Sequence, residues 1–204
     1  MKEKEIQDEL TSIRSLMERS AKFISLSGLA GILAGIYALI GAVVAFYLMQ
    51  SPIDYSSVTF LHLLNVLPAL ISIALAVLVA SVVTAVYLAY KKAARRGQSV
   101  WGSASKQLLF YMAVPLLTGG VLMIIFLYRG YFGIVAPTSL IFYGLALIGA
   151  SNFTFSDVKY LGLCEIVMGL ITALLPGYGL VFWALGFGVL HIVYGSVMYL
   201  KYDR

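Results

Sequence analysis

Six long apolar stretches dominate this chain of 204 residues, with short polar loops between them. A helix needs about 20 mostly apolar residues to cross the hydrocarbon core of a bilayer, and each stretch approaches or exceeds that length. Only 11% of the residues are charged, against roughly 25% in a typical soluble domain. The pattern predicts an all-α, polytopic membrane protein with six transmembrane helices arranged as three hairpins. The expected spans are Phe23–Met49, Leu63–Tyr90, Leu108–Tyr128, Ile134–Ala150, Val158–Leu175 and Leu180–Leu200.

The positive charges of the loops indicate how these helices are oriented. If the N-terminus is cytoplasmic, all of the 14 Lys and Arg residues except Arg129 lie in cytoplasmic segments. Cytoplasmic loops of membrane proteins carry an excess of Lys and Arg. The sequence therefore predicts that both termini are cytoplasmic. The net charge of +5 then reflects topology, and no nucleic-acid partner is expected.

Residues 1–22 are the most polar segment and are expected to form a cytoplasmic amphipathic helix, separate from the transmembrane domain of residues 23–204. Apolar residues recur in it at spacings of four, three and four, as on one face of a helix. Its acidic and basic residues balance, whereas a helix that binds anionic lipid is basic. We therefore expect contact with protein, namely a second copy, another protein or the underside of its own bundle, and an interfacial helix is the alternative. The apolar residues are Ile6, Leu10, Ile13 and Met17.

A cytoplasmic basic patch follows the second span, on a helix expected to continue beyond the membrane. Its spacing clusters the side chains near the negative C-terminal end of that helix. Two uses stay open: contact with lipid phosphates, and docking of the acidic part of the N-terminal helix. The patch consists of Lys91, Lys92, Arg95 and Arg96.

Small residues are spaced so that helix backbones can approach each other closely. In the first span, Ser27, Gly31 and Gly35 recur at steps of four. Glycines also pattern the last two spans. The segments are Gly162-Leu-Cys-Glu-Ile-Val-Met-Gly169, Leu175-Pro176 and Gly188-Val-Leu-His-Ile-Val-Tyr-Gly195.

In these segments the chain resembles the small six-helix bacterial membrane proteins of the HdeD type, which consist of three glycine-patterned hairpins and are linked to acid resistance. The resemblance implies that architecture, a place in the bacterial inner (plasma) membrane and a role in stress, and it implies no catalytic site. The charged N-terminal helix departs from the pattern.

Glu165 is the carboxylate placed well inside a span, and His191 is the histidine placed deep in the next one. Charged groups at such depth are costly and normally face partners within the bundle. The tight turn at residues 176–179 makes the two spans antiparallel, so we expect both side chains at a similar depth. A Glu–His pair exchanges a proton readily, which makes it a candidate proton site. The structural alternative is a polar pair that holds two helices in register.

Five further polar side chains are deep enough to line a cavity: Tyr37, Thr118, Tyr143, Thr172 and Tyr194. The chain has no phosphate-binding loop, zinc-binding helix motif or nucleophile elbow. Its single cysteine, Cys164, excludes a thiol-rich metal site. The sequence therefore predicts no enzyme, no cofactor and no metal.

Two functions are compatible with these features. The favoured one is a non-catalytic, stress-related inner-membrane protein that acts through protein or lipid contacts. The alternative is a transporter or channel for a small solute or for protons, using Glu165 and His191. A transport route needs polar groups from other helices at the same depth, and the sequence offers few besides tyrosines.

Overall fold

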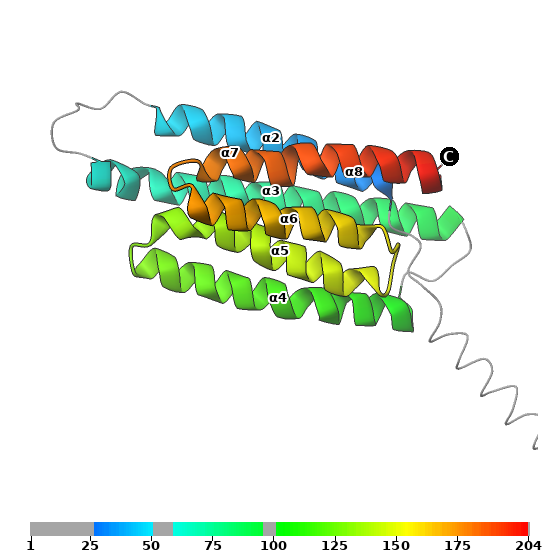
Figure 1. Cartoon of the computed structure of the whole chain (residues 1–204). Coiled ribbons are helices and arrows are strands. Elements are labelled where there is room, and N and C mark those ends of the chain that lie inside the picture. Colours follow the sequence, from blue (N-terminus) through cyan, green and yellow to red (C-terminus); the bar gives the residue numbers. More distant parts are fainter. Residues whose placement is uncertain (1–26, 51–58, 96–100, 204) are drawn as a thin grey trace, which may run out of the picture.

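The computed structural model describes residues 27–50, 59–95 and 101–203, and every element in these ranges is helical (Figure 1). The expected N-terminal helix, residues 1–22, lies outside the described residues. The α-helices are α2 (Gly28–Met49), α3 (Thr59–Arg95), α4 (Ser103–Tyr128), α5 (Val135–Ser151), α6 (Val158–Leu174), α7 (Gly179–Trp183) and α8 (His191–Met198).

The last part of the chain forms one continuous helix, which we call the C-terminal helix. It begins with α7, passes through a π-helical stretch at Ala184–Leu190, continues as α8 and ends in a second π-helical stretch at Tyr199–Asp203. Between α6 and α7 the chain turns tightly, with Gly177 in the left-handed region at φ 97°. A residue with a Cβ would be strained there.

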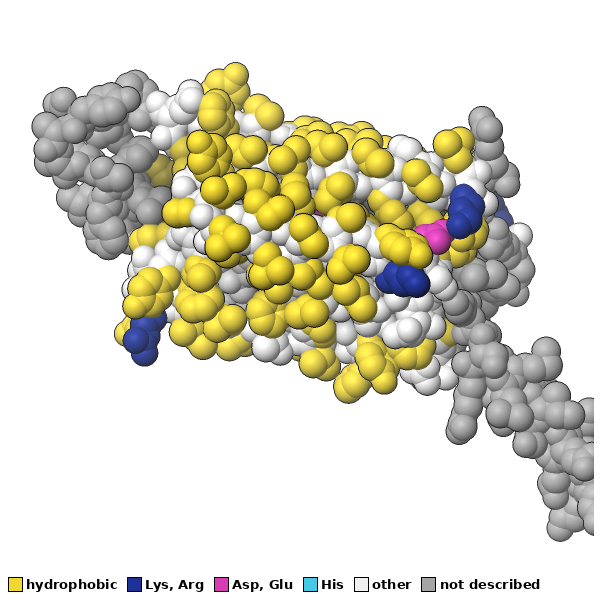
Figure 2. Space-filling model, viewed as in Figure 1, with side chains coloured by type: hydrophobic (Ala, Val, Ile, Leu, Met, Phe, Trp, Pro, Cys, Tyr) yellow, Lys and Arg dark blue, Asp and Glu magenta, His cyan; other side chains and the backbone are white. Residues whose placement is uncertain are grey.

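Five helices in the described part are long and apolar enough to cross a membrane: α2, α3, α4, the C-terminal helix, and α5 with the turn before it. The sixth expected span, α6, has 17 residues, the lower limit for crossing at about 1.5 Å per residue. Helix α3 continues to Arg95, as the sequence predicted. In Figure 2 apolar side chains cover the middle of the visible face, and Lys and Arg lie near its ends. These features indicate a membrane protein.

The helices pack in an order that the sequence does not reveal. Helix α5 lies between α4 and α6 (Figure 1), and α2 contacts both α3 and the C-terminal helix. Two of the closest pairings, α5 with α6 and α2 with the C-terminal helix, therefore join elements of different predicted hairpins. Contacts between α6 and the C-terminal helix are fewer, although these two helices are neighbours in sequence.

Facing glycines bring α5 and α6 together. A Cβ on Gly144 would lie 2.5 Å from the carbonyl oxygen of Gly162, and a Cβ on Gly162 would lie 2.7 Å from that of Gly144. Each glycine also receives an isoleucine from the opposite helix, Ile166 against Gly144 and Ile148 against Gly162. Because packing drives helix association in lipid, this reciprocal fit explains why the two helices form a close pair.

The same arrangement joins α2 to the C-terminal helix. A Cβ on Gly35 would lie 2.6 Å from the carbonyl oxygen of Gly188, and Ile192 packs over Gly35. Leu39 packs in turn over Gly188. Farther along, a Cβ on Gly195 would lie 2.6 Å from the backbone nitrogen of Ile32. The row of small residues predicted in the first span therefore faces the C-terminal helix.

Candidate functional site

Three helices bring one buried polar cluster together: Glu165 from α6, Tyr143 from α5, and His191 from the start of α8. Glu165 is 0% exposed and His191 is 6% exposed. The Oε1 atom of Glu165 lies 3.3 Å from Nδ1 of His191, a contact that agrees with the similar depth expected for these two residues. We call Glu165, His191 and Tyr143 the buried cluster.

The neighbours of His191 determine which ring nitrogen carries a hydrogen. Nδ1 lies 3.1 Å from the carbonyl oxygen of Gly186, and because a carbonyl only accepts, Nδ1 must donate. Nε2 lies 2.8 Å from the hydroxyl of Tyr143. In the neutral ring Tyr143 donates to Nε2, and in the charged ring Nε2 donates to Tyr143. Both protonation states of His191 therefore keep both hydrogen bonds.

Glu165, in contrast to His191, has no hydrogen-bond partner. Neither carboxylate oxygen accepts a hydrogen bond, because the hydrogen on Nδ1 of His191 points toward Gly186. An isolated ionised carboxylate is costly in an apolar interior. The ring of His191, 3.3 Å away, is the ionisable group that the described residues place beside this carboxylate.

The π-helical stretch provides the space that Glu165 occupies. A Cβ on Gly186 would lie 2.6 Å from Oε2 of Glu165, so a larger residue there would require the carboxylate to shift. Phe187, the next residue, contacts the rings of His191 and Tyr143 at centroid distances of 6.0 and 5.1 Å. Sequence reasoning missed both residues. Their signal was weak: Gly186 lies five residues before His191, and a single glycine in an apolar span usually serves only the packing of helices.

The other predicted cavity residues are not all near the buried cluster. The Tyr37 hydroxyl lies 3.3 Å from that of Thr84, so it joins α2 to α3. Thr118 is exposed on α4 and donates to the Val114 carbonyl, one turn back. Thr172 is buried on α6 but donates to a carbonyl of its own helix. Tyr194 follows His191 on α8, and its hydroxyl is buried without a hydrogen-bond partner. Tyr37 and Thr118 are therefore not part of the buried cluster, and Tyr37 instead lines a groove between α2 and α3.

Two apolar grooves on the described surface lie away from the buried cluster. One, of about 460 Å³, is lined by residues near the turn between α4 and α5. The other, of about 260 Å³, lies between α2 and α3 and includes Tyr37. Neither is lined by Glu165 or His191. The described residues also contain no group of three or more His, Cys, Asp or Glu side chains that could hold a metal ion.

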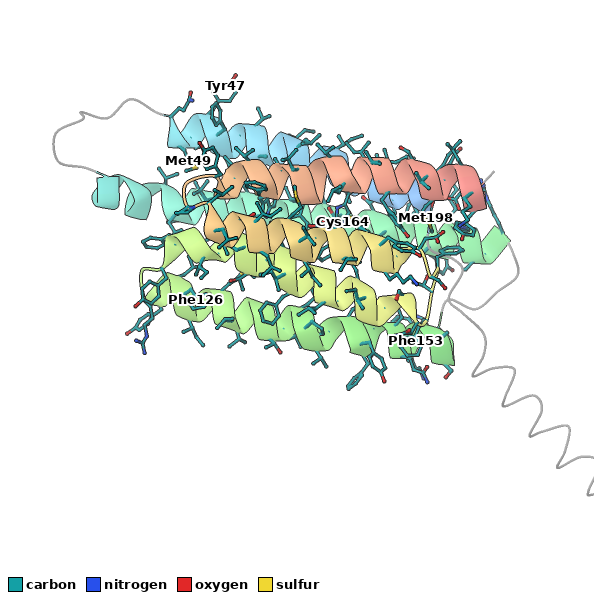
Figure 3. All side chains as sticks on the ribbon, viewed as in Figure 1. Tyr47, Met49, Phe126, Phe153, Cys164 and Met198 are labelled. Atoms are coloured by element: carbon teal, nitrogen blue, oxygen red, sulfur yellow. The ribbon has the colours of Figure 1, made fainter. Side chains whose placement is uncertain are left out.

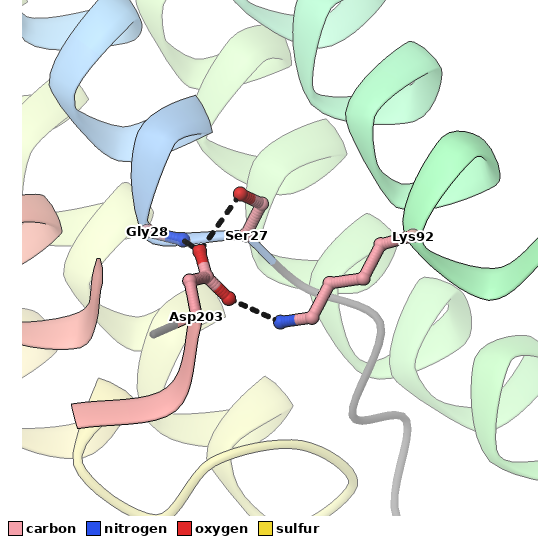
Figure 4. Close-up of polar contacts among 4 residues, drawn as sticks. All are labelled: Ser27, Gly28, Lys92 and Asp203. Carbon is pink, nitrogen blue, oxygen red and sulfur yellow. Dashed lines mark hydrogen bonds and ion pairs between the residues drawn. The ribbon is translucent and has the colours of Figure 1, made fainter. Parts of the chain in front are cut away.

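A second polar cluster closes the end of the bundle where the C-terminal helix finishes (Figure 4). One oxygen of Asp203 accepts hydrogen bonds from the Ser27 hydroxyl at 2.9 Å and the Gly28 N–H at 2.8 Å. The other oxygen forms an ion pair with Lys92 of α3. Asp203 thus caps the first turn of α2, which has no side-chain cap of its own. We call Ser27, Gly28, Lys92 and Asp203 the Asp203 clasp.

The Asp203 clasp changes the expected role of the basic patch. Lys92 is committed to Asp203, with its side chain only 14% exposed. Lys91 and Arg95 are exposed and remain suitable for lipid phosphates, whereas Arg96 lies outside the described residues. Docking of the N-terminal helix on this patch stays a prediction.

Replacing Asp203 by alanine is expected to lower the free energy of unfolding by about 1–3 kcal/mol, because the change removes the ion pair with Lys92 and leaves the Gly28 N–H of α2 without its cap. Asp157→Ala serves as the control, since Asp157 pairs with Lys201 at a more exposed position and such pairs contribute at most about 1 kcal/mol. Unfolding in detergent measures both. Equal losses in the two variants would contradict the importance of the clasp.

Asp157 precedes α6 at the same end of the bundle. Its Oδ2 accepts hydrogen bonds from Lys201 at 2.6 Å and from the Tyr202 hydroxyl at 2.9 Å. These bonds, chiefly that of Lys201, lower the pKa of Asp157. The resulting stabilisation is present above the ordinary pKa of an aspartate and is lost as the pH falls through the lowered value. Asp157 is therefore an ionised carboxylate at neutral pH.

Comparisons of this chain with protein-family models, with curated proteins and with solved structures found no match. The chemistry of the buried cluster is therefore the basis for a functional interpretation.

Proposed function

We propose that this chain is a non-catalytic, multi-pass protein of the bacterial inner membrane that binds a proton at Glu165 and His191. In this proposal, proton binding adjusts helix packing, and the protein acts in a stress response through contacts with protein or lipid. The observation that supports it most is the carboxylate of Glu165, which is 0% exposed, accepts no hydrogen bond and lies 3.3 Å from His191.

The surroundings of the pair favour proton binding over catalysis. Among the described residues, Tyr143 from α5 is the titratable group that hydrogen-bonds to the pair, through His191. Helix α2, which also packs on the C-terminal helix, has no charged residue between Gly28 and Met49, and its Tyr37 bonds to Thr84. Catalysis of known types needs several convergent polar groups and a pocket for substrate. A single buried pair fits the binding of a proton better.

Proton-linked transport is the second candidate. The π-helical stretch beside His191 favours it, since such stretches often occur at functional sites. However, the two grooves described above are apolar, and neither is lined by Glu165 or His191. We therefore prefer a proton-binding protein without a transported substrate.

The proposal is tested by measuring thermal stability in detergent as a function of pH. The wild type should show a transition that Glu165→Gln and His191→Gln each shift or weaken, because either change leaves one titratable group without its partner. Thr172→Val is the matched control. Thr172 lies on α6, is 2% exposed and has a hydroxyl that bonds to its own helix, so this variant should keep the transition. Identical pH profiles for the wild type and both glutamine variants would refute the proposal.

The orientation of the chain gives a separate prediction. Reporters placed after Arg204 and near Gly97 should lie in the cytoplasm, and one near Asp54 should lie outside, because the loops carry their positive charges on alternate sides. Fusions to a phosphatase and to a fluorescent protein distinguish the two sides. An external signal at either of the first two positions would contradict the predicted topology.

A further inference from the structure

The groove between α2 and α3, which we call the α2–α3 groove, has a volume of about 260 Å³ and lies between two of the long apolar helices. Small residues on both helices create it: Gly41 on α2, and Ala76 and Ala80 on α3. A Cβ on Gly41 would lie 2.7 Å from a methyl group of Val77. Both of these residues line the groove, so it follows the line along which the two helices touch. Tyr37 marks one end of it.

One side of α3 leads from the α2–α3 groove to the basic end of this helix. Val77 and Ala80 line the groove. Thr84, Tyr87 and Lys91 follow Ala80 at spacings of four, three and four, and residues at such spacings lie on the same side of a helix. At 1.5 Å per residue, Lys91 lies about 17 Å from Ala80 along the helix. Lys91 is thus the first charged residue that a molecule extending from the groove along this side would meet.

Two basic side chains are available at that end of α3. Lys91 and Arg95 are exposed, and neither forms an ion pair with a carboxylate of the described residues. Lys92, by contrast, pairs with Asp203, which also accepts a hydrogen bond from the Gly28 N–H. This link places Lys91 and Lys92 near the start of α2, where the apolar part of that helix begins. Cations at the end of an apolar groove complement the negative charge of a lipid phosphate.

The dimensions of the α2–α3 groove favour a single acyl chain. The volume of the groove, about 260 Å³, is below the roughly 300–1,000 Å³ of pockets for drug-sized molecules. A helix with its side chains is about 10–12 Å wide, too wide to enter it. A bilayer with its headgroups is about 40–45 Å thick, so the chains of one leaflet end about 20 Å below its surface. A lipid with its phosphate at Lys91 would therefore place the end of a chain in the groove.

The opposite end of the α2–α3 groove has no comparable contact for a headgroup. Beyond Val44, the last lining residue of α2, this helix continues to Tyr47 and Met49, which are labelled near its end in Figure 3. Neither Gly28–Met49 nor residues 59–90 of α3 include a charged residue. All charged residues of the two helices therefore lie at the end that carries Lys91, and an anionic headgroup would bind there.

We propose that the α2–α3 groove binds one acyl chain of an anionic phospholipid, with the phosphate of this lipid held by Lys91 and Arg95. Lys91 provides a positive charge on the side of α3 that lines the groove. Arg95, one turn farther along, provides a guanidinium, whose planar donors match the geometry of a phosphate. This surface is separate from Glu165 and His191, so the inference goes beyond the proposed function and is independent of proton binding by that pair.

The headgroup contact is tested by native mass spectrometry of the full-length protein. The protein is released from micelles that contain equal amounts of phosphatidylglycerol and phosphatidylcholine with identical acyl chains. The wild type should retain mainly phosphatidylglycerol. Lys91→Gln should lower the ratio of retained phosphatidylglycerol to phosphatidylcholine about fivefold, the effect expected for one basic residue near anionic lipid.

Lys106→Gln is the matched control for the headgroup contact. Lys106 is an exposed lysine near the start of α4, and no residue of α4 lines the α2–α3 groove. This variant should keep the wild-type ratio of the two lipids. The same ratio in the wild type and in Lys91→Gln would overturn the proposal.

The acyl-chain contact is tested by filling the α2–α3 groove. Ala76→Phe places a ring in the groove and should cause loss of most of the tightly held lipid, whatever its headgroup. Ala74→Phe is the matched control, because Ala74 is also exposed but lies on the opposite side of α3. Wild-type retention of lipid by Ala76→Phe would overturn the proposal. A wild-type dimer that Ala76→Phe converts to a monomer would also overturn it, since the groove would then be a contact between two copies.

Discussion

Replacing Glu165 or His191 by glutamine is expected to lower the free energy of unfolding by about 1–3 kcal/mol for each change, because each leaves a buried polar partner alone. The double variant should lose less than the sum of the two single losses. Residues in contact usually show coupling of about 0.5–3 kcal/mol in such cycles. Reversible unfolding in mixed micelles at one fixed pH measures all four proteins.

A second cycle controls for general weakening of the same two helices. Thr172→Val combined with His191→Gln should be additive, because the hydroxyl of Thr172 bonds to Met168 on its own helix. Additivity in the Glu165–His191 cycle as well would show that the 3.3 Å approach of these side chains contributes no interaction energy.

Adding one methyl group at the α5–α6 contact is expected to be as damaging as breaking the polar pair. A Cβ on Gly144 would lie 2.5 Å from a backbone oxygen of α6, and backbone cannot rotate away as a flexible side chain can. Gly144→Ala should therefore cost about 1–3 kcal/mol or more through overpacking. Gly195→Ala, which meets the backbone of α2, should behave in the same way.

Gly120→Ala is the matched control for both glycine variants. It also lies inside a long helix, but a Cβ there meets nothing within 4 Å. Because alanine favours helix over glycine by up to about 1 kcal/mol, this variant should be neutral or slightly more stable. Thermal unfolding of the three proteins in the same detergent measures the difference. Equal tolerance at residues 120 and 144 would mean that the helices are not held by close glycine contacts.

The helices themselves could be predicted because long apolar runs are unmistakable in a sequence. The extension of α3 to Arg95 followed from the same pattern. The similar depth of Glu165 and His191 could be predicted because a tight turn fixes how two antiparallel helices align. Both inferences depend only on residues that are near each other along the chain.

The pairing of helices could not be predicted in this way. Small residues occur on several spans, so the pattern shows that close contacts exist without showing which helices make them. The contact between Gly35 and Gly188 joins residues from opposite ends of the chain. The π-helical stretch beside His191 has no recognisable composition, since its residues would fit an ordinary apolar helix equally well.

The Asp203 clasp was also missed, although a signal was present. Outside residues 1–22 and Asp54, the chain has only three carboxylates: Asp157, Glu165 and Asp203. Each of them has a basic partner in the structure. Such scarcity suggests that each carboxylate is paired, but the partner of Asp203 is on another helix, and sequence spacing cannot identify it.

The central claim is that Glu165 and His191 bind a proton inside the bundle. Potentiometric titration of the folded wild type and of the Glu165→Gln, His191→Gln double variant tests it most directly, because every other titratable group is common to both proteins. The wild type should take up at least one more proton per chain between alkaline and acidic pH. Superimposable titration curves would contradict the claim and would leave the pair as a structural contact between two helices.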